Sequence, residues 1–285
     1  MGRLRRSLNP VAERTGGQRA LAVPDLLLVA VAIIVPLAFV VMRSFARVDP
    51  VTLGVEQVWT WDAYRTMFSP TYRPVLLRSA GLAALTVGLC VVVGTPAALA
   101  ISRLSDRWRN VVLVVVLLPS FVNFTVRIFA WQGLLANEGP VQSLFGVRWL
   151  YQTPAVAVGM ITAYVPLYLL PVVAALHRAP PAVFEAAADL GAGPWRTLWR
   201  VTLPLARVGV ATGVGVVGVL SLGEFVVPTL LGGGRVMLVG SLLAERGAGR
   251  DQPLAGALTA VLLLTLAVGG GLLAVLRRRL ARGSA

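Results

Sequence analysis

Six apolar runs constrain this chain more than any other feature of its sequence, because each is close to the length that crosses a bilayer. A bilayer core of roughly 30 Å takes about 20 helical residues. Within it the backbone has to satisfy its own hydrogen bonds, which a single segment does only as a helix. We therefore expect an all-α fold, a polytopic membrane protein with six transmembrane helices. The runs cover Leu26–Met42, Ala80–Ile101, Val111–Ile128, Ala155–Leu176, Val208–Leu230 and Leu254–Leu276.

Prolines lie inside several of these runs, where they would interrupt an isolated soluble helix. In a bundle, neighbouring helices and water can satisfy the carbonyl groups that proline leaves free. The spans are therefore expected to bend around a pathway. These prolines are Pro36, Pro96, Pro119, Pro166 and Pro171.

The composition agrees with a membrane protein and excludes several other functions. Hydrophobic residues make up 57% of the 285 residues and charged residues 13%, against about 25% charged in a soluble domain. Despite a net charge of +14, the chain has too little polar surface for a nucleic-acid groove, so no nucleic-acid partner is expected.

The basic residues and the cysteine count limit the chemistry further. All 26 basic residues are arginine, so there is no lysine for a phosphate-binding P-loop or a Schiff base. Cys90 and His177 are the sole cysteine and histidine, which excludes an intrachain disulfide and a Cys/His zinc site. We expect no catalytic residues, no metal and no cofactor bound by this chain.

Arginine is distributed unevenly between the segments outside the spans, and cytoplasmic loops carry the excess. We therefore expect both termini in the cytoplasm, as tails at 1–25 and 277–285 that flank a transmembrane domain at 26–276. The first run is interpreted as an uncleaved anchor, because Pro24 and Asp25 adjoin it and no small-residue cleavage site follows. Segments 1–25, 102–110, 177–207 and 277–285 hold 16 arginines, and segments 43–79, 129–154 and 231–253 hold 9.

The segment at 179–206, between the fourth and fifth spans, begins with the signals of a short helix. Pro181 suits a first helical turn, and Glu185 and Asp189 are four residues apart on one face. Gly191 suits the left-handed residue that ends a helix.

A second short helix is expected after Pro194, closed before Pro204. Its Trp195, Leu198 and Trp199 form an apolar stripe at helical spacing. The pattern suits either a hairpin that lies on the lipid headgroups or a docking element for a cytoplasmic partner.

The same segment resembles the EAA motif of the permease subunits of bacterial ATP-binding-cassette (ABC) importers. It reads Glu185-Ala186-Ala187, three residues, Gly191, nine residues, Val201, one residue and Leu203-Pro204, with valine in place of the usual isoleucine. The resemblance implies a type I importer permease of MetI-like fold in the bacterial inner membrane. It further implies that the loop at 179–206 forms the coupling helix, with an ATPase interface at Glu185, Ala186, Ala187 and Gly191 that ends at Leu203 and Pro204.

The resemblance also implies partners. They are a second permease subunit in a heterodimer, two ATPase subunits that use ATP and Mg, and an extracytoplasmic solute-binding protein. The absence of lysine fits a permease that leaves ATP hydrolysis to another chain.

Other segments resemble the spermidine/putrescine subgroup, in the first of its two permeases. They are Val126-Arg-Ile-Phe-Ala-Trp131 and Gly223-Glu-Phe-Val-Val-Pro-Thr-Leu-Leu-Gly-Gly233, with departures at Ile128, Phe129 and Val227. The function implied is polyamine uptake. The subgroup also contains importers of other small solutes, so a phosphonate, an opine or an amino-acid-like solute stays open.

Glu224 and Arg127 are the candidates for the solute pathway, because an ionisable residue within a span is costly and usually faces a pathway or a partner. Glu224 would offer a carboxylate to an ammonium group, and aromatic faces would attract the others. The alternative is that Glu224 and Arg127 pair with each other and join two spans. The candidate aromatic residues are Phe225, Trp131, Tyr164 and Tyr168.

Two other classes fit the sequence less well. A secondary transporter driven by an ion gradient would need paired broken helices in repeated halves and a titratable relay. An intramembrane enzyme would need a nucleophile and base, or metal ligands, within the spans.

Overall fold

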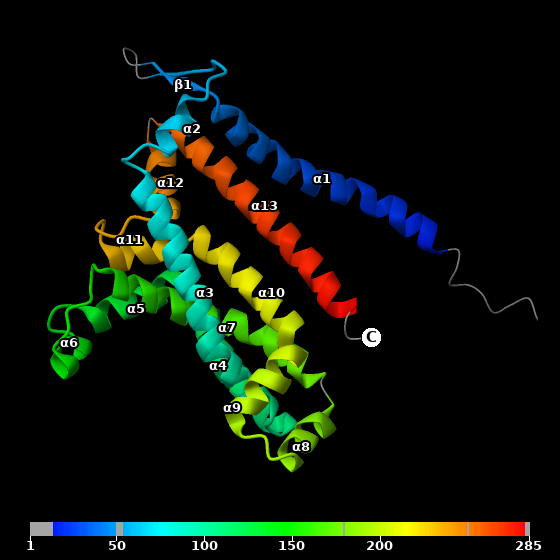
Figure 1. Cartoon of the computed structure of the whole chain (residues 1–285). Helices are drawn as coiled ribbons and strands as arrows, with labels where there is room; N and C mark the ends of the chain where they lie inside the picture. Colours follow the sequence, from blue (N-terminus) through cyan, green and yellow to red (C-terminus); the bar gives the residue numbers. More distant parts are fainter. Residues whose placement is uncertain (1–13, 50–53, 179, 250, 283–285) are drawn as a thin grey trace, which may run out of the picture.

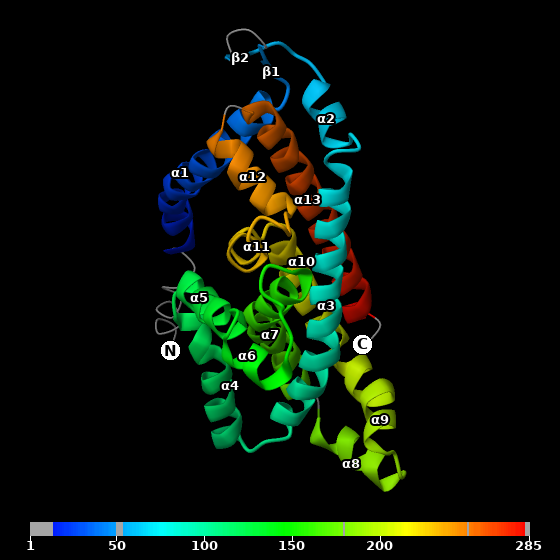
Figure 2. The ribbon, with the colours of Figure 1, turned by 90° about the vertical axis from the view of Figure 1, so that its left-hand side faces the viewer.

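The computed structural model describes residues 14–49, 54–178, 180–249 and 251–282. Residues 1–13 and 283–285 of the expected tails, and Ala179 at the start of the expected loop, lie outside the described residues. The described part is helical apart from one short antiparallel ribbon (Figures 1 and 2). In chain order the elements are α1 (Arg14–Arg43), β1 (Arg47–Val48), β2 (Val55–Glu56), α2 (Asp62–Met67), α3 (Arg73–Ser102), α4 (Asp106–Phe121), α5 (Phe124–Leu135), α6 (Pro140–Phe145), α7 (Thr153–His177), α8 (Pro181–Asp189), α9 (Pro194–Thr197), the π-helical turn η1 (Leu198–Thr202), α10 (Leu203–Leu222), α11 (Val226–Gly232), α12 (Val239–Ala248) and α13 (Gln252–Arg282).

The apolar helices follow the expected runs. Within the described residues, four helices are long and apolar enough to cross a membrane: α3, α7, the helix Trp195–Leu222 and α13 as far as Val275. The bent pair Asp106–Phe121 and Phe124–Phe145 adds a fifth if it counts as one span, and Leu27–Arg43 of α1 is a shorter apolar helix. The all-α polytopic fold is thereby confirmed.

The helices at the two ends of the chain run beyond the expected spans. The first, α1, begins at Arg14, inside the expected tail at 1–25, and α13 continues to Arg282, past Leu276.

The third expected span, Val111–Ile128, is not one helix. Its first part lies in α4, which ends at Phe121, and the apolar helices on the two sides of the break meet at 91°. The side chain of Asn123 accepts a 2.9 Å hydrogen bond from the Thr125 amide. The expected span is therefore divided sharply into two helices, because Asn123 caps a new helix in the middle of the apolar run.

The fifth expected span, Val208–Leu230, is broken as well. The chain leaves α10 after Leu222, and α11 begins at Val226. Pro228 favours the break, because it has no N–H to donate to the carbonyl of Glu224 and its ring would clash with that carbonyl in a continuous helix. The single helix expected here is thus corrected to two helices joined by residues 223–225.

The centre of the bundle is α7. In its apolar window 61% of the residues are buried, against 6% in α13, which lies at the periphery. Both α3 and α10 pack against α7 and against each other. Tyr168 of α7 fills this junction, since it is fully buried and its hydroxyl oxygen lies 2.8 Å from that of Thr95 in α3.

The two ends of the molecule are clearly distinct. The β1–β2 ribbon and α2 lie at one end, and α8 and α9 lie at the opposite end (Figures 1 and 2). The segments 43–79 and 177–207, which the sequence assigns to opposite sides of the membrane, therefore lie at opposite ends of the bundle, although they hold similar numbers of arginines, five and four.

Candidate functional site

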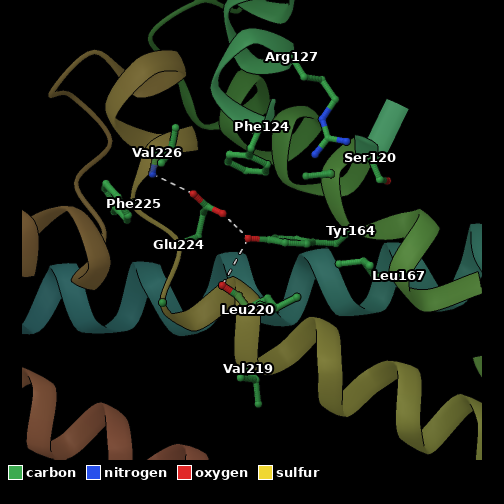
Figure 3. A pocket seen from close by; sticks show the side chains of 12 residues that line it. Ser120, Phe124, Arg127, Tyr164, Leu167, Val219, Leu220, Glu224, Phe225 and Val226 are labelled. Atoms are coloured by element: carbon green, nitrogen blue, oxygen red, sulfur yellow. Dashed lines mark hydrogen bonds between the residues drawn. The ribbon is translucent and has the colours of Figure 1, made fainter. Parts of the chain in front are cut away.

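A cavity of about 530 Å³ lies where the two helix breaks face each other across α7 (Figure 3). One wall comes from the α4–α5 bend, and the other from the end of α10 and residues 223–226. The breaks expose backbone that a continuous helix would cover, which membrane proteins tolerate where it lines a cavity. The lining residues are Ser120, Phe124, Arg127, Ala163, Tyr164, Leu167, Val219, Leu220, Gly223, Glu224, Phe225 and Val226.

Glu224 is buried, and both of its carboxylate oxygens accept hydrogen bonds from the protein. Oε1 accepts from the amides of Val226 at 2.8 Å and Val227 at 3.1 Å, and Oε2 accepts from the Tyr164 hydroxyl. The two amides belong to the first turn of α11, which has no intrahelical acceptors for them. The carboxylate therefore caps α11 and ties it to α7.

Arg127 lies across the cavity in α5 and points back to α4. Its Nη1 donates to the carbonyl of Pro119 at 3.1 Å, and the guanidinium carbon lies 5.3 Å from the centre of the Phe124 ring. Its Nε is buried without a hydrogen-bond partner among the described residues. No ion pair joins Arg127 to Glu224 in the described part of the chain.

The cavity brings together four of the six residues expected in the solute pathway. Glu224, Phe225, Arg127 and Tyr164 line it. Tyr168 lies instead in the core between α3, α7 and α10, and Trp131 is half-buried against that core. Sequence reasoning did not select Phe124 or Ser120, which also line the cavity.

The first half of the segment at 179–206 folds as expected. Gly191 has a φ of +69°. The amides of Gly191 and Ala192 donate to the carbonyls of Ala188 and Ala187, each at 2.9 Å, which is the Schellman arrangement that ends α8. Ala187 is buried, whereas Glu185 and Ala186 are exposed. The two faces of α8 therefore differ, and Glu185 and Ala186 lie on the accessible one.

Phe184 seats α8 on the rest of the bundle. It is half-buried against the core, and the Arg103 guanidinium carbon at the end of α3 lies 5.9 Å from the centre of its ring. A second cavity, of about 580 Å³, lies between α8 and the α3–α4 turn and is lined in part by Arg103, His177 and Glu185.

The second half of the segment at 179–206 differs from the expectation. The helix does not close before Pro204, because Trp195–Leu222 is one continuous helix. Pro204 cannot donate to the carbonyl of Arg200, and the π-helical turn η1 immediately before it accommodates that missing bond. The expected stripe is also divided, since Leu198 is buried while Trp195 and Trp199 are exposed.

Apolar spans, a cavity at two broken helices and a helical hairpin at one end define a polytopic membrane protein of transport type. The chain belongs to the family described as binding-protein-dependent transport system inner membrane component, whose model matches residues 90–284. It is a permease subunit of an ABC importer, not an enzyme, and it functions with other permease, ATPase and binding-protein chains.

Relatives of established name extend the match over most of the chain. The spermidine/putrescine transport system permease protein PotB of Haemophilus influenzae is 29% identical over 73% of this chain and 76% of its own length. PotB of Escherichia coli is 27% identical over 83% of this chain and 88% of its own length. The inner membrane ABC transporter permease protein YdcU of Escherichia coli is 30% identical over 79% of both chains.

Solved structures share the fold at lower identity. A chain of a bacterial alginate ABC transporter, solved with an alginate-bound periplasmic protein, aligns with a TM-score of 0.69 at 19% identity, covering 90% of this chain and 93% of its own. A chain of the MetNI methionine transporter aligns with a TM-score of 0.55 at 15% identity, covering 75% of this chain and 99% of its own.

Proposed function

We propose that this permease imports a polyamine of the spermidine/putrescine type. The observation that carries the proposal is the similarity to polyamine permeases over most of both chains. It agrees with the two segments, 126–131 and 223–233, that resemble this subgroup, and both segments contribute to the cavity at the helix breaks.

The solute can be tested by competition uptake in vesicles that contain the complete importer. Spermidine and putrescine are expected to compete for uptake, and amino acids and phosphonates are not. Vesicles without ATP provide the background. Competition by an amino acid or a phosphonate, with none by either polyamine, would overturn the assignment.

We propose that the cavity lined by Glu224, Phe225, Arg127 and Tyr164 is part of the solute pathway. Its position between two breaks supports this, because irregular backbone at membrane depth is tolerated where it lines a cavity. Tyr168 and Trp131, which lie outside the cavity, would act through packing.

We further propose that Glu185, Ala186, Ala187 and Gly191 couple this chain to its ATPase, and that Leu203 and Pro204 join the hairpin to the fifth span. ATP and Mg would be used by two ATPase subunits, alongside a second permease subunit in a heterodimer and a solute-binding protein. The exposure of Glu185 and Ala186 supports a docking role.

Copurification tests this docking. Glu185→Arg is expected to reduce the ATPase recovered with the permease, because it reverses a charge on the accessible face. Glu245→Arg, on α12 near the opposite end, is the matched control and should retain the ATPase. Full retention of the ATPase by Glu185→Arg, in a complex that still transports, would remove Glu185 from the interface.

A further inference from the structure

We propose that Glu224 and Arg127 are positioning residues, each of which holds one of the two helix breaks that wall the cavity. On this view neither residue binds the solute through its charge. The inference rests on the proposed role of the cavity as the solute pathway. It replaces both earlier options, a carboxylate offered to an ammonium group and an ion pair between the two side chains.

The hydrogen bonds of Glu224 join its carboxylate to the start of α11. Three donors already occupy the two carboxylate oxygens, and two of them are the amides that begin α11. A negative charge is favoured at a helix N-terminus, where these amides point. These donors use three of the roughly four acceptor sites of a carboxylate, and an ammonium group that displaced them would leave the Val227 amide buried without an acceptor.

The backbone of the same break is held from a second side. A Cβ atom on Gly240 of α12 would meet the backbone of residues 223 and 224, so α12 packs directly on the break. Residues 223–225 are thus fixed by α7 through Tyr164, by α11 through its amides and by α12 through Gly240. A side chain so constrained is suited to set the position of the backbone at the cavity wall.

Arg127 has the corresponding position at the other break, where its positive charge lies at the C-terminal end of α4. The carbonyl of Pro119 belongs to the last turn of α4, where carbonyl groups lack intrahelical partners. It accepts from Nη1 of Arg127 and from the Val122 amide at 3.3 Å. A cation is favoured at a helix C-terminus, and the Phe124 ring supports the guanidinium. Each charge therefore lies at the helix end that its sign stabilises.

The test at Glu224 compares variants that separate charge from hydrogen bonding. Glu224→Gln removes the charge but keeps an oxygen for the two amides and an amide group for Tyr164. Glu224→Ala removes all three bonds. We expect polyamine uptake by Glu224→Gln to be at least about fivefold above that of Glu224→Ala, because Gln keeps the cap of α11 and Ala removes it. The loss should fall on the maximal rate, with KM little changed.

The test at Arg127 uses the same logic. Arg127→Lys keeps a donor for the Pro119 carbonyl, and Arg127→Met removes it. We expect uptake by Arg127→Lys to be severalfold above that of Arg127→Met. If the charge only repelled a cationic solute, Met would instead raise uptake. The losses of Glu224→Ala and Arg127→Met should multiply in the double variant, because the two residues hold different breaks.

Several results would overturn the proposal: a Glu224→Gln variant as inactive as Glu224→Ala, increased uptake by Arg127→Met, or a double variant no worse than either single one. The amount of assembled complex is measured for every variant. If Glu224→Ala does not assemble, Tyr164→Phe removes one of the three bonds without a change of charge, and wild-type uptake in that variant would count against the proposal. The competition assay on the wild type gives the solute independently, so a wrong solute and a wrong role for Glu224 are distinguishable.

Discussion

At the residue scale, the packing of Tyr168 depends on two glycines. A Cβ atom on Gly94 would lie 2.5 Å from the Tyr168 ring, and one on Gly213 would lie 2.7 Å from it. Such distances are too short for an added methyl group, so Gly213→Ala is expected to destabilise the protein by about 1–3 kcal/mol through overpacking. Thermal unfolding of the purified complex measures the effect.

Gly218 offers a control for that prediction in the same helix. A Cβ atom there would make an ordinary 3.9 Å contact with Val87. Gly218→Ala should therefore leave the unfolding temperature unchanged or raise it slightly, since alanine favours helix. Equal unfolding temperatures for the two variants would show that Tyr168 is not tightly packed against Gly213.

Tyr164 and Tyr168 differ in position in a way that the sequence does not predict, because only Tyr164 lines the cavity. The two residues are four apart in α7 and have the same chemistry, so both were expected in the pathway. Only the neighbours distinguish them. Thr95 and two glycines enclose Tyr168, whereas Tyr164 reaches the break at Glu224. Such long-range contacts are not encoded in the local pattern of a helix.

At the scale of elements, the apolar runs predicted the long helices well because length and hydropathy decide what crosses a bilayer. Length and hydropathy did not reveal the two helix breaks, which lie inside apolar runs. Asn123 is a residue type that caps helices and Pro228 is one that interrupts them, so each break had a local signal inside an apolar run. The Gly191 turn was predicted correctly because its signal lies outside the six apolar runs, where no competing span was expected.

The cap at Asn123 is expected to stabilise the α4–α5 bend. Asn123→Ala removes the acceptor of the Thr125 amide and should cost about 1 kcal/mol. Asn123→Asp retains an acceptor oxygen and should behave like the wild type. Hydrogen exchange at the first amides of α5 measures the difference, and equal exchange in the two variants would mean that the bend is held elsewhere.

The turn at Gly191 allows a graded test of the hairpin. Its φ of +69° favours glycine, tolerates asparagine and is strained for a β-branched residue. ATPase copurification is therefore expected to fall in the order glycine, Gly191→Asn, Gly191→Val. Gly193→Val nearby, where a Cβ atom meets nothing within 4 Å and φ is not positive, serves as the control. A Gly191→Val variant that binds the ATPase as well as Gly193→Val would show that the left-handed turn is dispensable.

At the scale of the whole molecule, α2 and α8 lie at opposite ends of the bundle. The fold alone does not say which end faces the cytoplasm, so the orientation in the membrane is inferred from the distribution of charge. The group of segments with 16 arginines against 9 includes the segment 177–207, so we expect the end of the bundle that carries α8 to lie in the cytoplasm. Cys90 is buried and is the sole cysteine, which allows single-cysteine reporters on a Cys90→Ala background. Trp59 and Trp108 suit this purpose, since they are 72% and 61% exposed and belong to the segments 43–79 and 102–110. A membrane-impermeant maleimide should label Trp59→Cys in spheroplasts and Trp108→Cys only in inverted vesicles, with no labelling of the background; the reverse pattern would place both termini outside.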